Sequence, residues 1–188
     1  MFSRSAPVGV LNSYGTRSMR EKTEYRIRTA RPEDLDQIAA VEEACFPAAE
    51  AAGREQIRER LAAYRDSFLV AQLSKSDRII GFINGAVTDE RTISDEMFED
   101  ISLHNPRGAY QAIFGLDVAE EFRGQGIAAD LMRTMIRRAG NQGRAGLILT
   151  CKERLIGFYE KLGYRLLGLS KSVHGGAVWY DMILEFKE

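Results

Sequence analysis

Residues 116–128 constrain the fold of this chain more than any other segment. They pass from an apolar run into a turn that contains Gly124 and Gly126, and then into an amphipathic stretch with helical spacing. Glycine lets a ligand approach the backbone closely, and the N–H groups that begin a helix have no partners within it. The helix dipole adds about half a positive charge at the same place. The segment therefore predicts a strand, a turn and a helix that together bind an anion, most naturally a diphosphate.

This glycine turn (residues 123–128) differs from the two best-known phosphate-binding motifs. It lacks the Gly-Lys-Ser/Thr of a P-loop, and it lacks the third glycine of a dinucleotide fingerprint. These differences argue against NTP and NAD as ligands and favour a different phosphate carrier. Taken alone, the spacing of the glycines is equally consistent with an ordinary tight turn between a strand and a helix.

Strand and helix patterns alternate along most of the chain. Apolar runs bounded by turn residues predict strands over residues 25–28, 68–73, 79–87, 109–118, 147–151, 164–167 and 178–186. Apolar residues with helical spacing predict helices over residues 32–45, 54–64, 127–139 and 155–162. This order predicts an α/β (α+β) fold, with a mixed and mainly antiparallel central sheet of about seven strands and helices on both of its faces.

The composition sets the limits of the domain. Residues 1–22 carry few large apolar side chains, so we expect a flexible tail there and a single domain over residues 23–188. Met19 offers an alternative start of the native chain. Residues 88–108 are acidic and polar, which predicts a loop with at most one helical turn around Met97.

Charge and cysteine usage exclude several kinds of partner. The chain has 26 Lys and Arg against 27 Asp and Glu, a net charge of -1, so it has no overall field to hold nucleic acid. Cys45 and Cys151 are far apart and predict neither a disulfide framework nor a metal site. No apolar run approaches the roughly 18 residues of a membrane span. We therefore expect a soluble, cytoplasmic protein that does not bind membranes or metal.

The glycine turn and its surroundings resemble the acetyl-CoA motif of the GNAT superfamily, Arg/Gln-x-x-Gly-x-Gly/Ala. Arg123, Gly126 and Ala128 match that motif. Residues 152–164 resemble the other signature of the superfamily, a helix that ends Phe/Leu-Tyr-x-Lys-x-Gly-Phe/Tyr. Lys152 departs from the asparagine that the family often has at the start of this segment. Two matching segments at the right separation are much harder to obtain by chance than one.

Membership of this superfamily implies the GNAT fold, with acetyl-CoA as a co-substrate and no metal. In that fold the central strands splay apart at a bulge, for which Gly115 is the candidate here. The backbone beyond the bulge pairs with the pantetheine arm, and the glycine turn holds the diphosphate. The resemblance implies that the cofactor is bound by Leu116, Asp117, Val118, Arg123, Gly124, Gln125, Gly126, Ile127, Ala128 and Phe158.

Shorter matches indicate one branch of the superfamily. Residues 149–153, 158–160 and 103–104 resemble the serotonin (arylalkylamine) N-acetyltransferase-like branch. The animal enzymes of that branch use two histidines as a proton relay, at positions that hold Ala112 and Phe114 in this chain. That relay is therefore absent.

Acetyl transfer to an amine makes two chemical demands on the site. An alkylammonium with a pKa of about 10.4 must lose its proton before attack, so a base or a water path is expected. The reaction expels a thiolate, and a hydroxyl donor suits that leaving group. Tyr159, at the tyrosine position of the second signature, is the predicted donor. The candidate bases are Glu50, His104 and His174, each of which is also consistent with a structural or solvated role.

Aromatic and acidic residues predict the acceptor pocket, because a carboxylate with aromatic faces suits an amine cation. The candidates are Phe46, Glu50, Phe114 and Trp179. Asp117 is the only carboxylate of the predicted central strand. Strand alternation predicts that it faces outward or caps the turn, and we assign it no part in catalysis.

These features predict an acetyl-CoA-dependent N-acetyltransferase that acts on a small primary amine, either an arylalkylamine or a polyamine. An acetyltransferase for proteins or peptides is the alternative enzyme. A non-catalytic acetyl-CoA-binding module is the alternative outside enzymes. An edge strand at the C-terminus would allow two subunits to pair, so a homodimer is a further expectation.

Overall fold

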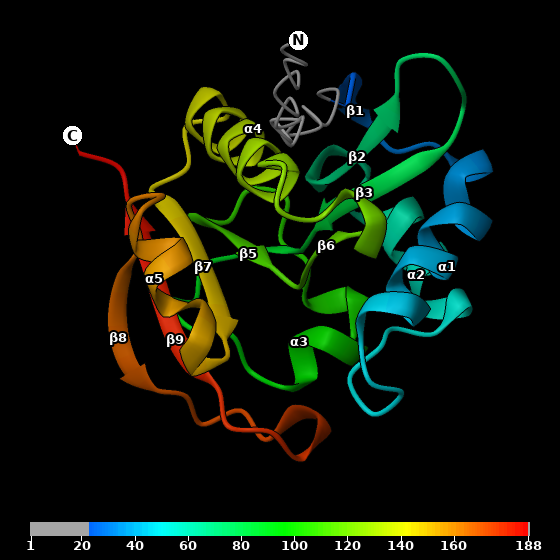
Figure 1. Ribbon diagram of the computed structural model, residues 1–188. Coiled ribbons are helices and arrows are strands. Elements are labelled where there is room, and N and C mark those ends of the chain that lie inside the picture. Colours follow the sequence, from blue (N-terminus) through cyan, green and yellow to red (C-terminus); the bar gives the residue numbers. More distant parts are fainter. Residues whose placement is uncertain (1–22, 188) are drawn as a thin grey trace, which may run out of the picture.

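The computed structural model describes residues 23–187, and the predicted tail over residues 1–22 lies outside the described residues. The chain forms two β-sheets with helices packed around them (Figure 1). The first sheet is antiparallel and has the order β1-β2-β3-β6, formed by Tyr25–Thr29 (β1), Phe68–Leu73 (β2), Ile79–Asn84 (β3) and Gly115–Val118 (β6). The second has the order β4-β5-β7-β9-β8, formed by Val87–Thr88 (β4), Tyr110–Ile113 (β5), Gly146–Cys151 (β7), Arg165–Leu169 (β8) and Tyr180–Glu185 (β9).

The mixed and mainly antiparallel character of the fold is confirmed. β5 and β7 run parallel, whereas the other neighbours in the second sheet are antiparallel. The number of strands differs from the prediction. Each of the two predicted strands over residues 79–87 and 109–118 is split into two strands, one in each sheet. The described residues therefore hold nine strands in two sheets instead of about seven in one.

Close backbone contact explains both divisions. A Cβ at Gly85, between β3 and β4, would lie only 1.8 Å from the carbonyl oxygen of Ala112, so the two segments cross where a side chain has no room. Phe114 connects β5 to β6, and its N–H donates to the carbonyl oxygen of Asn84 at 2.8 Å. Apolar residues continue through the division at Phe114, so the hydrophobic pattern could not reveal it. Asn84-Gly85, a dipeptide typical of turns, did mark the division between β3 and β4.

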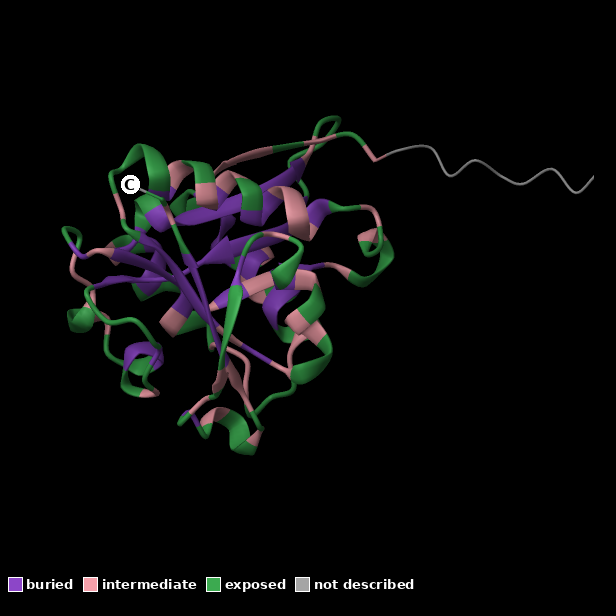
Figure 2. Cartoon of the chain, turned by 90° about the vertical axis from the view of Figure 1, so that its left-hand side faces the viewer, coloured by how far each residue is buried: buried purple, intermediate pink, exposed green. Residues whose placement is uncertain are grey.

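Helices cover both faces of the first sheet, as predicted: α1 (Leu35–Cys45) and α2 (Arg54–Ala63) lie on one face, and α4 (Ile127–Asn141) lies on the other. The short helix α5 (Ile156–Glu160) packs against β8 of the second sheet. On β2, Leu69 and Ala71 pack in the core cluster that contains residues of α4 and α5. Phe68 and Val70, which point to the opposite face, pack in the cluster formed with α1 and α2. Figure 2 shows these buried strands at the centre of the molecule, with exposed residues on the outer sides of the helices.

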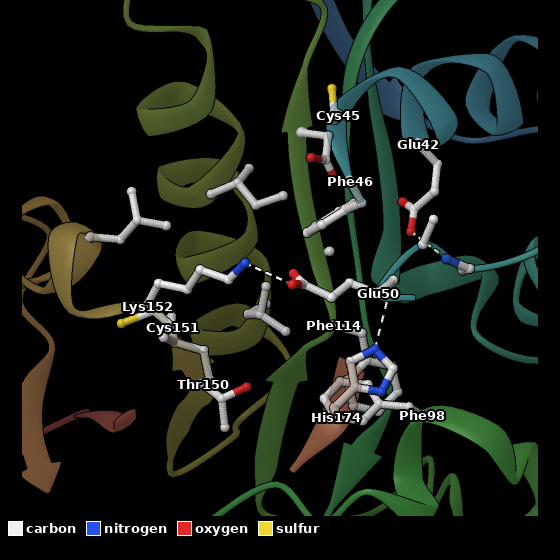
Figure 3. Close-up of a pocket in the computed structure, with 18 of the residues that line it drawn as sticks. Glu42, Cys45, Phe46, Glu50, Phe98, Phe114, Thr150, Cys151, Lys152 and His174 are labelled. Carbon is white, nitrogen blue, oxygen red and sulfur yellow. Dashed lines mark hydrogen bonds and ion pairs between the residues drawn. The ribbon is translucent and has the colours of Figure 1, made fainter. Parts of the chain in front are cut away.

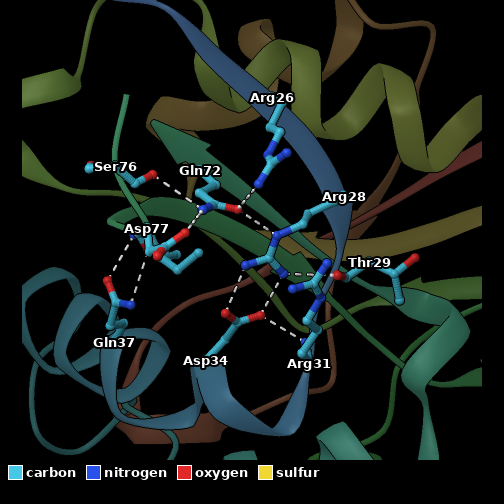
Figure 4. Close-up of polar contacts among 10 residues, drawn as sticks. Arg26, Arg28, Thr29, Arg31, Asp34, Gln37, Gln72, Ser76 and Asp77 are labelled. Carbon is cyan, nitrogen blue, oxygen red and sulfur yellow. Dashed lines mark hydrogen bonds and ion pairs between the residues drawn. The ribbon is translucent and has the colours of Figure 1, made fainter. Parts of the chain in front are cut away.

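A buried ion pair fixes the start of α1 against β1. The predicted proline entry is present as a 3-10 turn (Pro32–Asp34) directly before the helix. Asp34 accepts from both terminal nitrogens of Arg28, at 2.6 and 2.8 Å, and from the N–H of Arg31 at 2.8 Å. Gln72 of β2 accepts from Arg28 Nε at 2.7 Å and extends the network to the next strand (Figure 4). The orientation of α1, and so of the loop that follows it, is fixed relative to the sheet.

The acidic segment over residues 88–108 is more ordered than a solvated loop. It contains α3 (Glu96–Glu99), which confirms the expected helical turn, and a 3-10 turn at Ile101–Leu103. Met97 and Phe98 are buried against the second sheet. Among residues 23–187, no helix is both long and apolar enough to cross a membrane.

Candidate active site

A cavity of about 560 Å³ lies where β6 separates from β7. β5 pairs with β7 as far as Ile113 and Leu149, after which the chain turns away and β6 pairs with β3. The predicted splaying of the central strands is thus present, and Gly115 stands at the point of divergence. The walls come from the α1–α2 loop, β6, the end of β7, α5 and the segment before β9 (Figure 3).

The glycine turn has the geometry of an anion site. Gly124 and Gly126 have φ of +74° and +86°, and a Cβ at either position would meet no atom within 4 Å. Gly126 caps α4, whose first backbone bond runs from the N–H of Asp130 to the carbonyl oxygen of Gly126 at 3.0 Å. Within residues 23–187 no acceptor is found for the N–H groups of Gly126, Ile127 and Ala128. These groups are therefore free for a ligand at the start of a 15-residue helix.

The predicted cofactor-binding residues fall into three places. Leu116, Asp117, Val118, Arg123 and Ala128 line the cavity. Gly124, Gln125, Gly126 and Ile127 form the turn next to it, where the Ile127 side chain is buried in the core. Phe158 does not line the cavity and packs against Tyr159 with ring centres 5.0 Å apart.

Arg123 links the glycine turn to the cavity. Its Nε donates to the carbonyl oxygen of Val118 at 2.9 Å, and Nη2 lies 3.2 Å from the sulfur of Cys45. The guanidinium is thereby positioned between the turn, β6 and the end of α1. A positive charge at this place adds to the helix dipole in attracting an anion.

Tyr159 lies on α5 and reaches the cavity with its phenol. The residue is 7% exposed, and its hydroxyl makes no hydrogen bond to any other described residue. Burial raises the pKa of Tyr159 well above its ordinary value, and the neighbouring Cys151 and Asp117 raise it further. The hydroxyl stays protonated at neutral pH and is available as a hydrogen-bond or proton donor.

Cys151 lies beside Tyr159 but is poorly suited to act as a nucleophile. Burial raises the pKa of its thiol to about 11, and the sulfur packs 3.6 Å from that of Met182. A thiol rather than a thiolate is present at neutral pH, and only the thiolate is strongly nucleophilic.

Glu50 extends from the α1–α2 loop into the cavity (Figure 3). Its side chain is 7% exposed, and Oε1 pairs with Lys152 Nζ at 2.8 Å. Oε2 is enclosed and has no hydrogen-bond partner among the described residues. His174 Nε2 lies 3.2 Å from the carbonyl oxygen of Glu50, which brings two of the three candidate bases together.

The third candidate base, His104, lies elsewhere. It is not part of the cavity wall. Its Nδ1 accepts a hydrogen bond from the N–H of Val87 at 3.0 Å, and its ring packs 4.9 Å from that of Tyr64. These contacts give His104 a role in holding the loop before β5.

The aromatic residues predicted for the acceptor pocket line one continuous surface. Phe46, Phe114 and Trp179 all contribute to the cavity wall. Phe98 of α3 joins them, with its ring centre 5.0 Å from Phe114 and 4.8 Å from the ring of His174. Sequence reasoning missed Phe98 because it lies in a segment whose composition indicated a solvated loop.

Asp117 corrects the expectation that this carboxylate faces outward or caps the turn. It is 7% exposed and lines the cavity, because α1 covers the face of β6 that would otherwise be solvated. Its Oδ2 is enclosed, has no hydrogen-bond partner within residues 23–187, and lies 3.6 Å from where a Cβ of Gly115 would be. Burial, and then the nearby Glu42, raise the pKa of Asp117 well above its ordinary value. A single carboxylate within an apolar strand was the signal for such a site.

The sequence profile of the acetyltransferase (GNAT) family matches residues 35–164, which include the glycine turn, β6, β7 and α5. The chain belongs to this family.

Two named N-acetyltransferases are similar to this chain over part of their length. Serotonin N-acetyltransferase of Mesocricetus auratus is 30% identical over 92 residues, which are 48% of this chain and 43% of that protein. N-acetyltransferase 8B of Homo sapiens is 27% identical over 106 residues, 55% of this chain and 40% of that protein. The chain thus spans less than half the length of these relatives. The solved GphF GNAT-like decarboxylase, in complex with isobutyryl-CoA, has the same fold, with a TM-score of 0.74, 21% identity, and coverage of 86% of this chain and 100% of that one.

Two departures from the GNAT pattern have visible structural consequences. Ala112 is fully buried outside the cavity wall, and Phe114 belongs to the aromatic wall, so neither position provides a group that can accept a proton. Lys152 is engaged by Glu50, and its Nζ lies 5.4 Å from the ring centre of Trp179. Among residues 23–187, no group of three His, Cys, Asp or Glu side chains is arranged to hold a metal ion.

Proposed function

We propose that this GNAT chain is an acetyl-CoA-dependent N-acetyltransferase that transfers acetyl directly to a small primary amine. A single cavity carries the proposal. It extends from Arg123 and Ala128, at the two ends of the glycine turn, to the hydroxyl of Tyr159. It also reaches Oε2 of Glu50 and Oδ2 of Asp117, which have no hydrogen-bond partner among the described residues. An anion site, a proton donor and a proton acceptor are the three elements that the transfer requires.

The residues of the splayed region fit coenzyme A. Free N–H groups and the missing Cβ atoms at Gly124 and Gly126 suit the diphosphate. Arg123 supplies a neighbouring positive charge, and the edge of β6 that β7 leaves unpaired suits the amides of pantetheine. Bound acetyl-CoA would supply a thioester, whose acyl carbon accepts the amine lone pair and whose sulfur leaves with the electrons of the C–S bond.

Tyr159 and Asp117 divide the proton transfers between them. The ammonium nitrogen loses two protons when it becomes an amide. Asp117 accepts the first, which leaves the nitrogen lone pair free for attack, and passes it to water. The second reaches the leaving sulfur through Tyr159, whose hydroxyl donates its own proton and is restored from the nitrogen. The products are the amide, a thiol and one released proton.

Asp117 suits the role of proton acceptor better than Glu50 does. Oε1 of Glu50 is held by Lys152 Nζ at 2.8 Å, so one of the two oxygens of this carboxylate already has a partner. Asp117 has no ion-pair partner within residues 23–187, and its raised pKa brings it closer to that of an amine. The free Oε2 of Glu50 and the ring of Trp179 would then hold the ammonium group.

A contact between two loops at the cavity favours a small acceptor rather than a peptide. Gly175 packs so closely on the α1–α2 loop that a Cβ there would lie 2.5 Å from Cγ of Glu50. Two chain segments thus meet above the aromatic wall, where a peptide acceptor would need an open groove. An arylalkylamine or polyamine fits such an enclosed volume better.

Steady-state kinetics with acetyl-CoA and a panel of amines would test this function. We expect amide formation with 2-phenylethylamine or spermidine to exceed that with peptides. Tyr159→Phe should lower kcat about 100-fold or more, because the thiolate loses its donor, while the Kd of acetyl-CoA stays unchanged. Tyr164→Phe is the matched control, since it removes a neighbouring hydroxyl that contacts only the Met132 sulfur, at 3.2 Å, among the described residues. Binding of acetyl-CoA without transfer to any amine would instead establish a non-catalytic module.

A further inference from the structure

Arg60 of α2 is a buried cation in the wall of the same cavity. It is 5% exposed, and its guanidinium lies 5.3 Å from the ring centre of Phe114. Nη2 donates to the carbonyl oxygen of Phe98 at 2.8 Å. Nε is enclosed without a partner, and Nη1 makes no hydrogen bond to another described residue. No carboxylate within residues 23–187 lies close enough to form an ion pair with it.

A buried guanidinium without an ion-pair partner lowers the stability of a folded protein. The effective penalty for burying an ion is several kcal/mol, and arginine cannot avoid it by losing its proton. Glu42 is near enough to favour the charge on Arg60. Its Oε1, however, accepts from the N–H of Ala52 at 2.7 Å, and Glu42 does not come close enough to Arg60 to form an ion pair. An uncharged donor would suffice to bind the Phe98 carbonyl, so that contact does not explain a cation.

Arg60 and Asp117 each lie next to one of two consecutive residues, Phe114 and Gly115. The guanidinium packs over the Phe114 ring, and Oδ2 of Asp117 lies next to Gly115. The wall of the cavity therefore holds a cation and a carboxyl group, and neither Nη1 of Arg60 nor Oδ2 of Asp117 has a hydrogen-bond partner among the described residues. A ligand that carries a carboxylate and an ammonium group could bind Arg60 with the first and Asp117 with the second.

We propose that the acceptor is an amine that also carries a carboxylate, as an amino acid does. This inference rests on the proposed acetyltransferase function and narrows its substrate class. The amino group lies at Asp117 and Glu50, and the carboxylate accepts from Nη1 of Arg60. The aromatic wall then holds the rest of the molecule.

Matched pairs of acceptors would test the proposal in the wild-type protein. The pairs are phenylalanine with 2-phenylethylamine, phenylalanine with its methyl ester, and 4-aminobutyrate with butylamine. Each pair differs in the presence of the carboxylate or its charge. We expect at least one acceptor with a carboxylate to have a kcat/KM about 10- to 100-fold above that of its partner, as for one hydrogen bond to a charged group.

The variant Arg60→Gln separates recognition from structural support. Glutamine can still donate to the Phe98 carbonyl but has no charge. It should erase the preference within a pair through a higher KM for the carboxylate acceptor, and Arg60→Lys should restore part of it. An equal loss for both members of a pair would show a structural role and overturn the proposal.

The outcomes separate this inference from the function on which it rests. Transfer to plain amines without any preference for a carboxylate, in the wild-type protein, would overturn this inference alone. Absence of transfer to every amine would overturn the acetyltransferase function and the inference with it.

Discussion

Asp117 shows how a single side chain changes its chemistry with its surroundings. Its carboxyl is ionised in water at neutral pH, but in the cavity burial and the charge of Glu42 favour the protonated form. The proton acceptor must be ionised, so kcat/KM should rise with pH as Asp117 loses its proton, at a pH well above the ordinary range of an aspartate. The fall of kcat/KM on the acid side of the pH profile (the acid limb) is therefore assigned to protonation of Asp117.

The variant Asp117→Asn should remove that limb. We expect kcat/KM to fall about 100-fold or more near neutral pH and to become less dependent on pH, because amide groups do not accept the proton. Rates measured from acid to alkaline pH with one amine would check this. Glu50→Gln is the control, since it should raise KM for the amine and leave the acid limb in place. An unchanged profile in Asp117→Asn would assign the base elsewhere.

At the residue scale, local motifs predicted backbone contacts better than side-chain environments. Arg123, Gly126 and Tyr159 follow from short patterns. The structure places Arg123 and Tyr159 in the wall of one cavity and Gly126 in the turn beside it. The environment of Asp117 depends on α1, which is distant in sequence, so alternation along its own strand gave the wrong orientation. Arg60 gave no signal at all, because an arginine on a helix is ordinarily solvated.

At the scale of elements, the cavity depends on a contact between two loops. The 3-10 turn at His174–Gly176 lies against the α1–α2 loop through His174 and Gly175. Asp95 holds the other side of this turn, accepting from the hydroxyl of Ser172 and from the N–H of Val173 at 3.0 Å. These segments are far apart in the sequence and no local pattern links them. The sequence therefore identified Glu50 and His174 as candidates, but it could not predict that the two loops are in contact.

Substitution of Gly175 would test this contact. Gly175 and Gly176 both have positive φ, of +61° and +69°, so alanine strains the backbone at each. A Cβ at Gly175 also collides with Glu50, at 2.5 Å, and with the carbonyl oxygen of Ala49, at 3.1 Å, whereas one at Gly176 meets nothing within 4 Å.

Gly175→Ala should therefore displace Glu50 and raise KM for the amine about 10-fold or more, whereas Gly176→Ala should change it little. The Kd of acetyl-CoA should stay the same in both. Kinetics of the two variants side by side would decide, and equal effects would mean that backbone strain alone is responsible.

At the scale of the whole molecule, the site exists because two sheets share the Phe114 junction. β6 belongs to the sheet covered by α1, and β7 belongs to the other, so the gap between them reaches from the glycine turn to the aromatic wall. A ligand that spans the gap contacts both sheets and should stabilise the fold as a unit. The C-terminal strand β9 is not the edge that was expected, because it lies between β7 and β8. The edge is β8, which exposes Leu166, Leu167 and Leu169, and a homodimer stays a prediction.

Thermal unfolding with acetyl-CoA would measure this coupling. At a ligand concentration about 100 times Kd, binding adds about 2.7 kcal/mol to the free energy of unfolding. For a domain of this size, that corresponds to a rise in Tm of roughly 5 to 10 °C. Gly126→Asp should abolish the rise, because it places a carboxylate where the diphosphate binds and strains a residue with φ of +86°.

Gly143→Asp is the matched control for that experiment. Gly143 has a φ of +71°, no atom within 4 Å of a Cβ, and a position beyond the opposite end of α4. Both variants add a carboxylate at a residue with positive φ, so both strain the backbone. The helix dipole favours the charge at Gly126 and disfavours it at Gly143, so the free Gly143→Asp protein should have the lower Tm. Only Gly143→Asp should regain stability with acetyl-CoA, because only there is the anion site intact. A full rise in Tm for Gly126→Asp would mean that coenzyme A binds away from the start of α4.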